Sequence, residues 1–194
     1  MKRGAAEEVA RCFRSVLPGG GRPKQPIVLR IVLWELLRAD WAAIKEACPN
    51  PLTYVFPHFF AVAAYRVSHA LWRAGHARLS RAAMLLGQVL TGAEISGAAT
   101  FGPGLRLTHT GGIVVGSGVV AGANVILYSG VLLGNYGPSR EGQPTLGNGV
   151  RVCSKASVLG PVQVGDGALI GAHALVVGDV PAGGTVRAPV AVVA

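Results

Sequence analysis

The sequence predicts a mainly β protein, a parallel β-helix preceded by an α-helical segment, and a six-residue apolar repeat is the first observation behind this prediction. The repeated positions are Ile95, Phe101, Leu107, Val115, Ala121, Leu127, Leu133, Leu146, Val152, Val158, Val164, Ile170 and Val176. Neither the 3.6-residue period of a helix nor the alternation of a simple strand gives this interval. A hexapeptide repeat does, because each hexad forms a short strand and a turn and three hexads close one coil. We therefore expect the repeated residues to point inward.

The glycine content is the second observation. The chain of 194 residues contains 28 glycines, and glycine follows the repeated residue at positions 102, 116, 122, 134, 147, 165 and 171. The corners of a coil need backbone with positive φ, which glycine adopts without steric cost. A hydrophobic content of 51% is also enough to bury a sizeable core.

The third observation is a helical pattern before the repeat. The apolar residues at helical spacing are Ile27, Ile31, Trp34 and Leu37. Pro49 and Pro51 separate this segment from a second one with the same pattern, since proline interrupts a helix. We expect a flexible N-terminal arm over residues 1–26, an α-helical domain over 27–90 and the β-helix over 91–194.

The charge of the chain is concentrated before the β-helix. Residues 1–90 hold 13 Lys and Arg against 5 Asp and Glu, a balance of +8, whereas the remaining residues hold 5 against 4, a balance of +1. Most of these arginines are scattered along the predicted helices, which is typical of a solvated helical face. We expect no nucleic-acid partner. Peripheral contact with a membrane stays open, because arginines flank the apolar stripes.

The cysteines and the N-terminus indicate a reduced, cytoplasmic protein. Cys12, Cys48 and Cys153 lie far apart and form no CxxC pair, so neither a metal site nor a disulfide framework is expected. The segment 1–26 lacks the apolar core of a secretion signal. No segment reaches the ~20 apolar residues that a spanning helix requires.

Two breaks in the repeat mark where chemistry is expected. Val115 follows Leu107 by 8 positions (115 − 107), and the excess over a hexad coincides with His109. Leu146 follows Leu133 by 13 positions (146 − 133), so a loop over 135–145 leaves the coil. Insertions in a solenoid form loops on one face, and that face often binds ligands.

His109 is the residue at the first break with the clearest chemical use. A neutral imidazole, with an ordinary pKa of about 6.5, can remove the proton of a hydroxyl near neutral pH. From spacing alone, a surface histidine that decorates a turn explains the break equally well.

Several segments in a fixed order resemble bacterial serine acetyltransferases and their polysaccharide-modifying relatives. These segments are Ala64-Tyr65-Arg66-Val67-Ser68-His69-Ala70-Leu71-Trp72, Thr91-Gly92-Ala93-Glu94-Ile95, Gly102-Pro103-Gly104-Leu105, His109 and Gly112-Ile113-Val114-Val115-Gly116. The resemblance runs from about Trp41 to the C-terminus. It implies a left-handed β-helix, acetyl-CoA as acyl donor, and homotrimers or dimers of trimers.

The resemblance also assigns roles at the acceptor site. It makes His109 the general base and places at Glu94 the carboxylate that fixes the tautomer of such a base. The alternative for Glu94 is a solvated charge at the edge of the first coil. Glu94 precedes His109 by 15 positions (109 − 94), which is not a full coil of three hexads, so spacing alone does not show contact.

The chain departs from the family where the acceptor binds. Serine acetyltransferases commonly carry Asp before the base and an Arg-His pair in the loop, and Thr108, Gly142 and Gln143 stand at these positions. An amino-acid acceptor has an ammonium and a carboxylate, which are costly to bury without ionic partners. Arg140 or Arg106 could supply a cation, and Gln143 could hydrogen-bond a hydroxyl or be only a turn residue.

The resemblance places acetyl-CoA in a groove between the coils of neighbouring subunits. The candidate donor-binding residues are Gly134, Asn135, Ser154, Ala172 and Lys155. A small residue at a corner is also explained by the corner alone. A backbone N–H near Gly134 is expected to stabilise the oxyanion.

Three functions follow from these expectations. The first is an acetyl-CoA-dependent O-acetyltransferase that acts on a small hydroxyl compound, which could be serine-like, a sugar or a specialised metabolite. The second is serine O-acetyltransferase of cysteine biosynthesis, and the third is a catalytically silent β-helix scaffold. Because the chain stops at Ala194 soon after the last hexad, we expect no complex with cysteine synthase.

Overall fold

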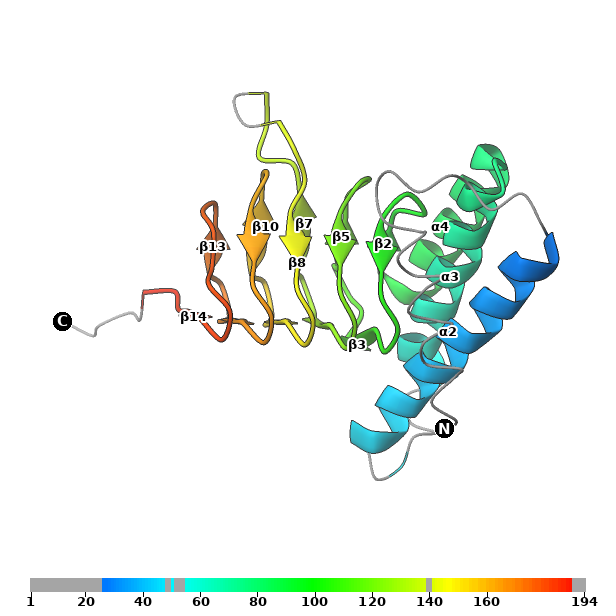
Figure 1. Cartoon of the computed structure of the whole chain (residues 1–194), viewed down its shortest axis with the longest axis horizontal. Coiled ribbons are helices and arrows are strands. Elements are labelled where there is room, and N and C mark those ends of the chain that lie inside the picture. Colours follow the sequence, from blue (N-terminus) through cyan, green and yellow to red (C-terminus); the bar gives the residue numbers. More distant parts are fainter. Residues whose placement is uncertain (1–25, 48–49, 51–54, 139–140, 190–194) are drawn as a thin grey trace.

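A computed structural model describes residues 26–47, 50, 55–138 and 141–189. A parallel β-helix forms one end of the molecule and a group of helices forms the other, as Figure 1 shows. The predicted fold class is therefore confirmed. The predicted arm, residues 1–26, lies outside the described residues apart from Pro26, which begins the first helix.

The β-helix has three faces, each a parallel sheet of stacked short strands. Face A contains β1 (Glu94–Ile95), β4 (Val114–Val115), β7 (Leu132–Gly134), β10 (Ser157–Leu159) and β13 (Leu175–Val176). Face B contains β2 (Thr100–Phe101), β5 (Val120–Ala121), β8 (Thr145–Leu146) and β11 (Gln163–Val164). Face C contains β3 (Arg106–Thr108), β6 (Ile126–Tyr128), β9 (Arg151–Val152), β12 (Leu169–Ile170) and β14 (Thr185–Val186). From β1 to β13 successive strands occupy the three faces in turn, so three strands make one coil; between β13 and β14, face B continues only as a bridge of Val180 to Val164.

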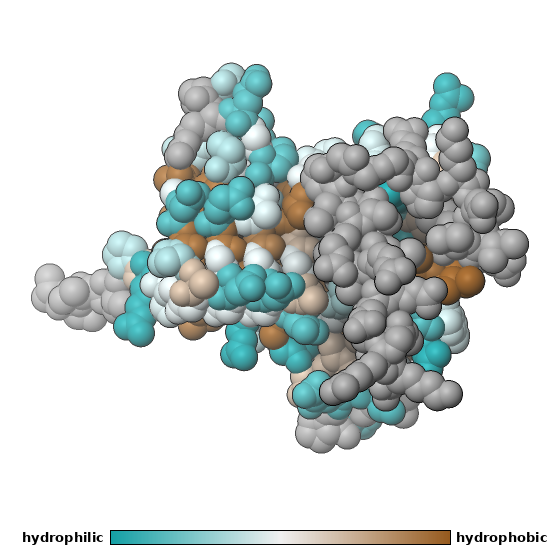
Figure 2. Space-filling model, viewed as in Figure 1, coloured by the Kyte–Doolittle hydropathy of each residue, from teal (hydrophilic) through white to brown (hydrophobic). Residues whose placement is uncertain are grey.

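The strand register stacks the repeated residues into inward-facing rows. In face A, Ile95 pairs with Val115 and Val115 with Leu133, and the row continues through Val158 to Val176. All of these side chains are buried. Side chains alternate across a strand, so their neighbours point outward, and the outer surface mixes apolar and hydrophilic side chains along the coils (Figure 2). Each six-residue unit thus consists of one strand, which lies in one face, and the corner that leads to the next face.

In the described part of the chain, four helical segments precede the coils. They are α2 (Pro26–Ala47), the short π-helical segment η2 (Val55–Phe59), α3 (Phe60–Arg73) and α4 (Ala77–Thr91). Helix α4 ends at Gly92, which has a φ of 76° and whose N–H donates to the carbonyl of Gln88. This left-handed cap turns the chain from helix into the first strand. None of the described helices is long and apolar enough to cross a membrane.

A buried ion pair joins the helices to the first coil. The Arg66 Nε donates to Asp40 Oδ2 over 2.8 Å, and both side chains are buried. Arg66 also donates to the carbonyls of Phe101 and Gly102, each over 2.7 Å. The backbone N–H groups of Gly104 and Leu105 donate to Asp40 Oδ1, each over 2.9 Å. The interpretation of helical arginines as solvated is therefore wrong for Arg66, whose guanidinium satisfies backbone carbonyls in the core.

His69 forms a second polar contact between α3 and the first coil. Its Nδ1 lies 2.8 Å from the carbonyl oxygen of Gly97, so this nitrogen carries the proton and donates. Burial lowers the pKa of His69 to about 4, against the opposing effect of the hydrogen bond to Gly97. The ring is consequently neutral in the folded protein at neutral pH.

The lowered pKa of His69 predicts loss of stability in mild acid. The unfolded chain binds a proton at an ordinary pKa of 6.5, whereas the folded chain binds it only near 4. The contribution of His69 to the free energy of unfolding is therefore complete above about pH 6.5 and decreases as the pH falls towards 4. Urea unfolding at pH 7 and pH 5 should show a smaller loss for His69→Gln than for the unaltered protein. Equal losses would contradict this account, and His76→Gln, at an exposed histidine, is the matched control.

Candidate functional site

His109 lies on a two-residue bulge at the corner between face C and face A. Thr108 of β3 pairs with Tyr128 of β6 in the next coil, and the N–H of Gly130 donates to the carbonyl of Gly111. The coil of His109 therefore has two more residues between the strand and the corner than the coil that follows it. His109 itself has a φ of 58° and an exposed side chain. Such a left-handed backbone is uncommon outside glycine. The first break in the repeat therefore displays an imidazole at the surface of the coil.

The bulge is anchored on its inner side by Thr110. The buried hydroxyl of Thr110 donates to the carbonyl of Thr91 over 2.6 Å. The N–H of Gly112 donates to the carbonyl of Gly92, so the corner stacks on the turn that leads out of α4. These two contacts fix the backbone on which His109 is mounted.

A second imidazole, that of His58 in η2, lies against His109. The ring centroids are 5.9 Å apart and the rings are inclined by 67°, an edge-to-face arrangement. Burial and, to a smaller extent, His109 lower the pKa of His58. His58 was not predicted as a site residue. No sequence signal joins the two histidines, because they are 51 positions apart (109 − 58) in different elements.

Glu94 begins β1, directly after the turn on which the His109 corner stacks. Its half-buried carboxylate accepts a hydrogen bond from Gln88 Nε2 of α4 over 2.9 Å. Within the described part of the chain, no hydrogen bond joins Glu94 to His109. The structure thus brings the two residues to the same edge, and the pairing itself stays a prediction.

Thr108 and Arg106 lie on β3 beside the bulge, where both are half-buried and share the outer side of face C. Tyr128 is the partner of Thr108 on the next coil. Arg140 lies outside the described residues. Among the predicted acceptor residues, Thr108 directly precedes His109 in the sequence, and it lies at the end of the strand that leads into the bulge.

Gln143 lies at the other edge of face A. The loop that contains it leaves the coil after β7 and returns at β8, and it projects from the β-helix in Figure 1. The Gln143 side chain covers the corner between β4 and β5, since a Cβ added at Gly118 would lie 3.3 Å from Gln143 Cγ. Gln143 Oε1 is buried without a hydrogen-bond partner among the described residues.

The candidate donor residues divide between the same two edges. Ser154, Lys155 and Ala172 belong to the corners between faces C and A, on coils that follow that of His109. Gly134 ends β7 and Asn135 follows it, at the edge where the loop of Gln143 begins. The predicted residues therefore form two groups in one chain, separated by the width of face A.

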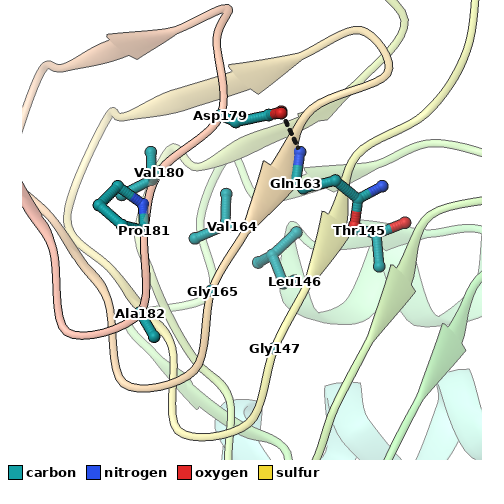
Figure 3. A pocket seen from close by; sticks show the side chains of 10 residues that line it. All are labelled: Thr145, Leu146, Gly147, Gln163, Val164, Gly165, Asp179, Val180, Pro181 and Ala182. Atoms are coloured by element: carbon teal, nitrogen blue, oxygen red, sulfur yellow. Dashed lines mark hydrogen bonds between the residues drawn. The ribbon is translucent and has the colours of Figure 1, made fainter.

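A depression of about 530 Å³ lies elsewhere, on face B near the end of the β-helix. Figure 3 shows Thr145, Gln163 and Asp179 around it, with Asp179 Oδ1 accepting a hydrogen bond from the N–H of Gln163 over 2.8 Å. It contains none of the predicted site residues. Within the described ranges, no group of three or more His, Cys, Asp or Glu residues could hold a metal ion.

Comparison with curated proteins decides the family. The chain is 40% identical over 132 residues to serine acetyltransferase of Helicobacter pylori, a match that covers 68% of this chain and 77% of that protein. The chain belongs to the serine acetyltransferase family. The Mycobacterium tuberculosis member of this family is 37% identical over 151 residues, which cover 75% of this chain and 66% of that protein. The chain thus spans about two thirds of the length of that relative. No protein-family model matches it.

Solved serine acetyltransferases share the fold. The crystal structure of the Neisseria gonorrhoeae serine acetyltransferase matches with a TM-score of 0.75 and 34% identity, over 81% of this chain and 65% of that one. The soybean serine acetyltransferase complexed with serine matches with a TM-score of 0.73 and 34% identity, over 79% of this chain and 65% of that one. The β-helix described above is accordingly the left-handed β-helix of serine acetyltransferases.

Proposed function

We propose that this protein is an acetyl-CoA-dependent O-acetyltransferase and that serine is its acceptor. Membership of the serine acetyltransferase family carries the proposal, through 40% identity over 132 residues with the Helicobacter pylori protein. The bulge that displays His109 supports it, because a general base must reach a bound hydroxyl.

His109 would act on the acceptor hydroxyl. Its neutral imidazole accepts the hydroxyl proton while the oxygen attacks the thioester carbonyl carbon of acetyl-CoA. The tetrahedral intermediate then collapses, the carbon–sulfur bond breaks, and the proton passes from the imidazolium to the departing sulfur of CoA. Glu94 would accept the other ring N–H and stabilise the imidazolium, and a backbone N–H near Gly134 would stabilise the oxyanion.

On this proposal, a site that uses all of the candidate residues needs a second copy of the chain, which supports a homo-oligomer such as a trimer or a dimer of trimers. His109, Ser154 and Ala172 lie at one edge of face A, whereas Gly134 and Gln143 lie at the other. If the first edge of one copy meets the second edge of the next, each interface gains both groups, and such head-to-tail contacts form a ring when the rotation between copies closes. The buried and unpartnered Oε1 of Gln143 would then be available to a donor from the acceptor or the neighbouring copy.

One feature of the site favours a second candidate acceptor, a neutral hydroxyl compound such as a sugar. Serine presents an ammonium group that requires an anionic partner when it is buried. The residue before His109 is Thr108, which has no charge, and on this proposal the partners of the Glu94 carboxylate are Gln88 and His109. A neutral acceptor would need no ion pair at this point.

An assay of CoA release separates these functions. The protein is mixed with acetyl-CoA and a thiol-reactive dye, first with L-serine and then with sugars and other hydroxyl compounds. Thiol release with serine supports serine acetyltransferase, and release only with another acceptor supports the second candidate. A protein that binds no acetyl-CoA would be a scaffold. The His109→Ala variant and a reaction without acceptor control for hydrolysis.

A further inference from the structure

The imidazole of His109 has little to hold it in one orientation. It is exposed, and within the described residues no hydrogen bond to either ring nitrogen is found. Its backbone is fixed by the anchored corner, so its two side-chain torsions decide where the ring points. A base that must face both a hydroxyl and a thioester loses rate when its orientation varies.

The ring of His58 supplies the missing contact. The 5.9 Å separation and 67° inclination between the two rings fall within the geometry that aromatic pairs prefer. Because the two rings are in contact, the half-buried ring of His58 limits the orientations open to the exposed ring of His109. Among the described aromatic pairs, it is the contact that connects the helical segment to the bulge.

The segment that carries His58 packs on the helices and on the first coil. Phe59, the neighbour of His58, packs edge-to-face on Trp41 of α2, with ring centroids 5.2 Å apart. Segment η2 also contacts α3, α4 and β3. Helices α2 and α3 are in turn fixed to the first coil by the buried pair of Asp40 and Arg66. The position of His58 relative to the bulge is therefore determined by the whole helical segment.

The charge state of His58 suits this position. Burial, followed by the nearby His109, lowers the pKa of His58, so its ring is neutral near neutral pH. A neutral ring does not repel the imidazolium that forms on His109 during transfer, whereas a second cation at this distance would.

We propose that His58 is a positioning residue for the general base: its ring, carried by η2, fixes the imidazole of His109 in the orientation that removes the acceptor proton. This inference rests on the proposed function and adds a residue to it. In this role the ring of His58 acts by its shape, and His58 transfers no proton.

Two substitutions test the role of the ring. His58→Ala removes the contact and should lower kcat by about 10-fold, with little change in the KM for acetyl-CoA. His58→Phe keeps a planar ring and should retain kcat within about threefold. A smaller loss in His58→Phe than in His58→Ala would show that the shape of the ring is what matters. His76→Ala, at an exposed histidine before α4, is the matched control. The inference fails if His58→Phe loses as much activity as His58→Ala, or if His58→Ala changes only the KM for the acceptor.

A double-mutant cycle shows whether His58 acts through His109. In the His109→Ala background, His58→Ala should cause no further loss of kcat, because the orientation of an absent ring no longer matters. A loss of the same factor in both backgrounds would give His58 an independent role and overturn the inference.

A readout without turnover separates this inference from the proposed function. Carbon-13 spectra of the histidine rings should show that His58→Ala shifts the His109 signals, whereas His76→Ala leaves them unchanged. If the unaltered protein transfers no acetyl group to any hydroxyl, the proposed function fails while this contact is still measured. If it transfers acetyl normally and His58→Ala leaves both kcat and the His109 signals unchanged, only the inference on His58 fails.

Discussion

Replacement of His109 by alanine is expected to lower kcat by about 10²- to 10⁴-fold, the range in which a positioned general base contributes. The loss follows from the need to remove the hydroxyl proton as the oxygen attacks the thioester. Without the imidazole, the proposed acceptor of this proton is missing. The effect is measured as the rate of CoA release with acetyl-CoA and the acceptor that the unaltered protein uses.

The fold should survive the His109→Ala substitution. The side chain is exposed, and the bulge is anchored by Thr110 and Gly112. The far-ultraviolet circular dichroism and the unfolding midpoint should therefore match those of the unaltered protein and of the control His76→Ala. An unchanged kcat in a folded His109→Ala variant would remove His109 from the mechanism and assign removal of the proton to another group.

The β-helix could be predicted because its signal is local. The repeated residue of each hexad contacts its equivalents one coil away, so the same six-residue interval recurs wherever the coil continues. The break at His109 was visible for the same reason, since two extra residues displace every later repeat. Its place at the corner between faces C and A follows from the register of Thr108 with Tyr128.

Contacts between distant segments could not be predicted in the same way. Asp40, His58 and Arg66 lie in helical segments, and nothing in their spacing distinguishes them from residues on a solvated face. Their roles depend on how the helices pack on the first coil. The guanidinium of Arg66 is buried and donates to the carbonyls of Phe101 and Gly102. The spacing of residues in the sequence does not indicate this contact.

Which edge of face A each candidate residue occupies also could not be derived from the sequence. The spacing of the repeat shows that Gly134 and Ser154 are corner residues, but not which of the three corners each one occupies. The insertion over 135–145 interrupts the six-residue spacing. Only the register of β7 with β10 shows which edge of face A the later residues occupy.

The buried pair of Asp40 and Arg66 predicts the largest effect on stability. Asp40→Ala leaves the Arg66 guanidinium buried without its counter-ion and also removes the acceptor of two backbone N–H groups. Removal of one partner of a buried ion pair costs about 3–5 kcal/mol, because the remaining charge cannot reach water. We expect the free energy of unfolding, measured in urea at pH 7, to fall by about this amount.

A surface ion pair on the same helix provides the matched control for Asp40→Ala. Arg38 Nη1 lies 3.8 Å from Glu35 Oε1, and both side chains are exposed. Exposed pairs contribute about 0–1 kcal/mol, so Glu35→Ala should leave the free energy of unfolding almost unchanged. If Asp40→Ala cost no more than Glu35→Ala, the pair would not anchor α2 and α3 to the first coil. The position of His58 would then depend on the other contacts of η2, with α2, α3, α4 and β3.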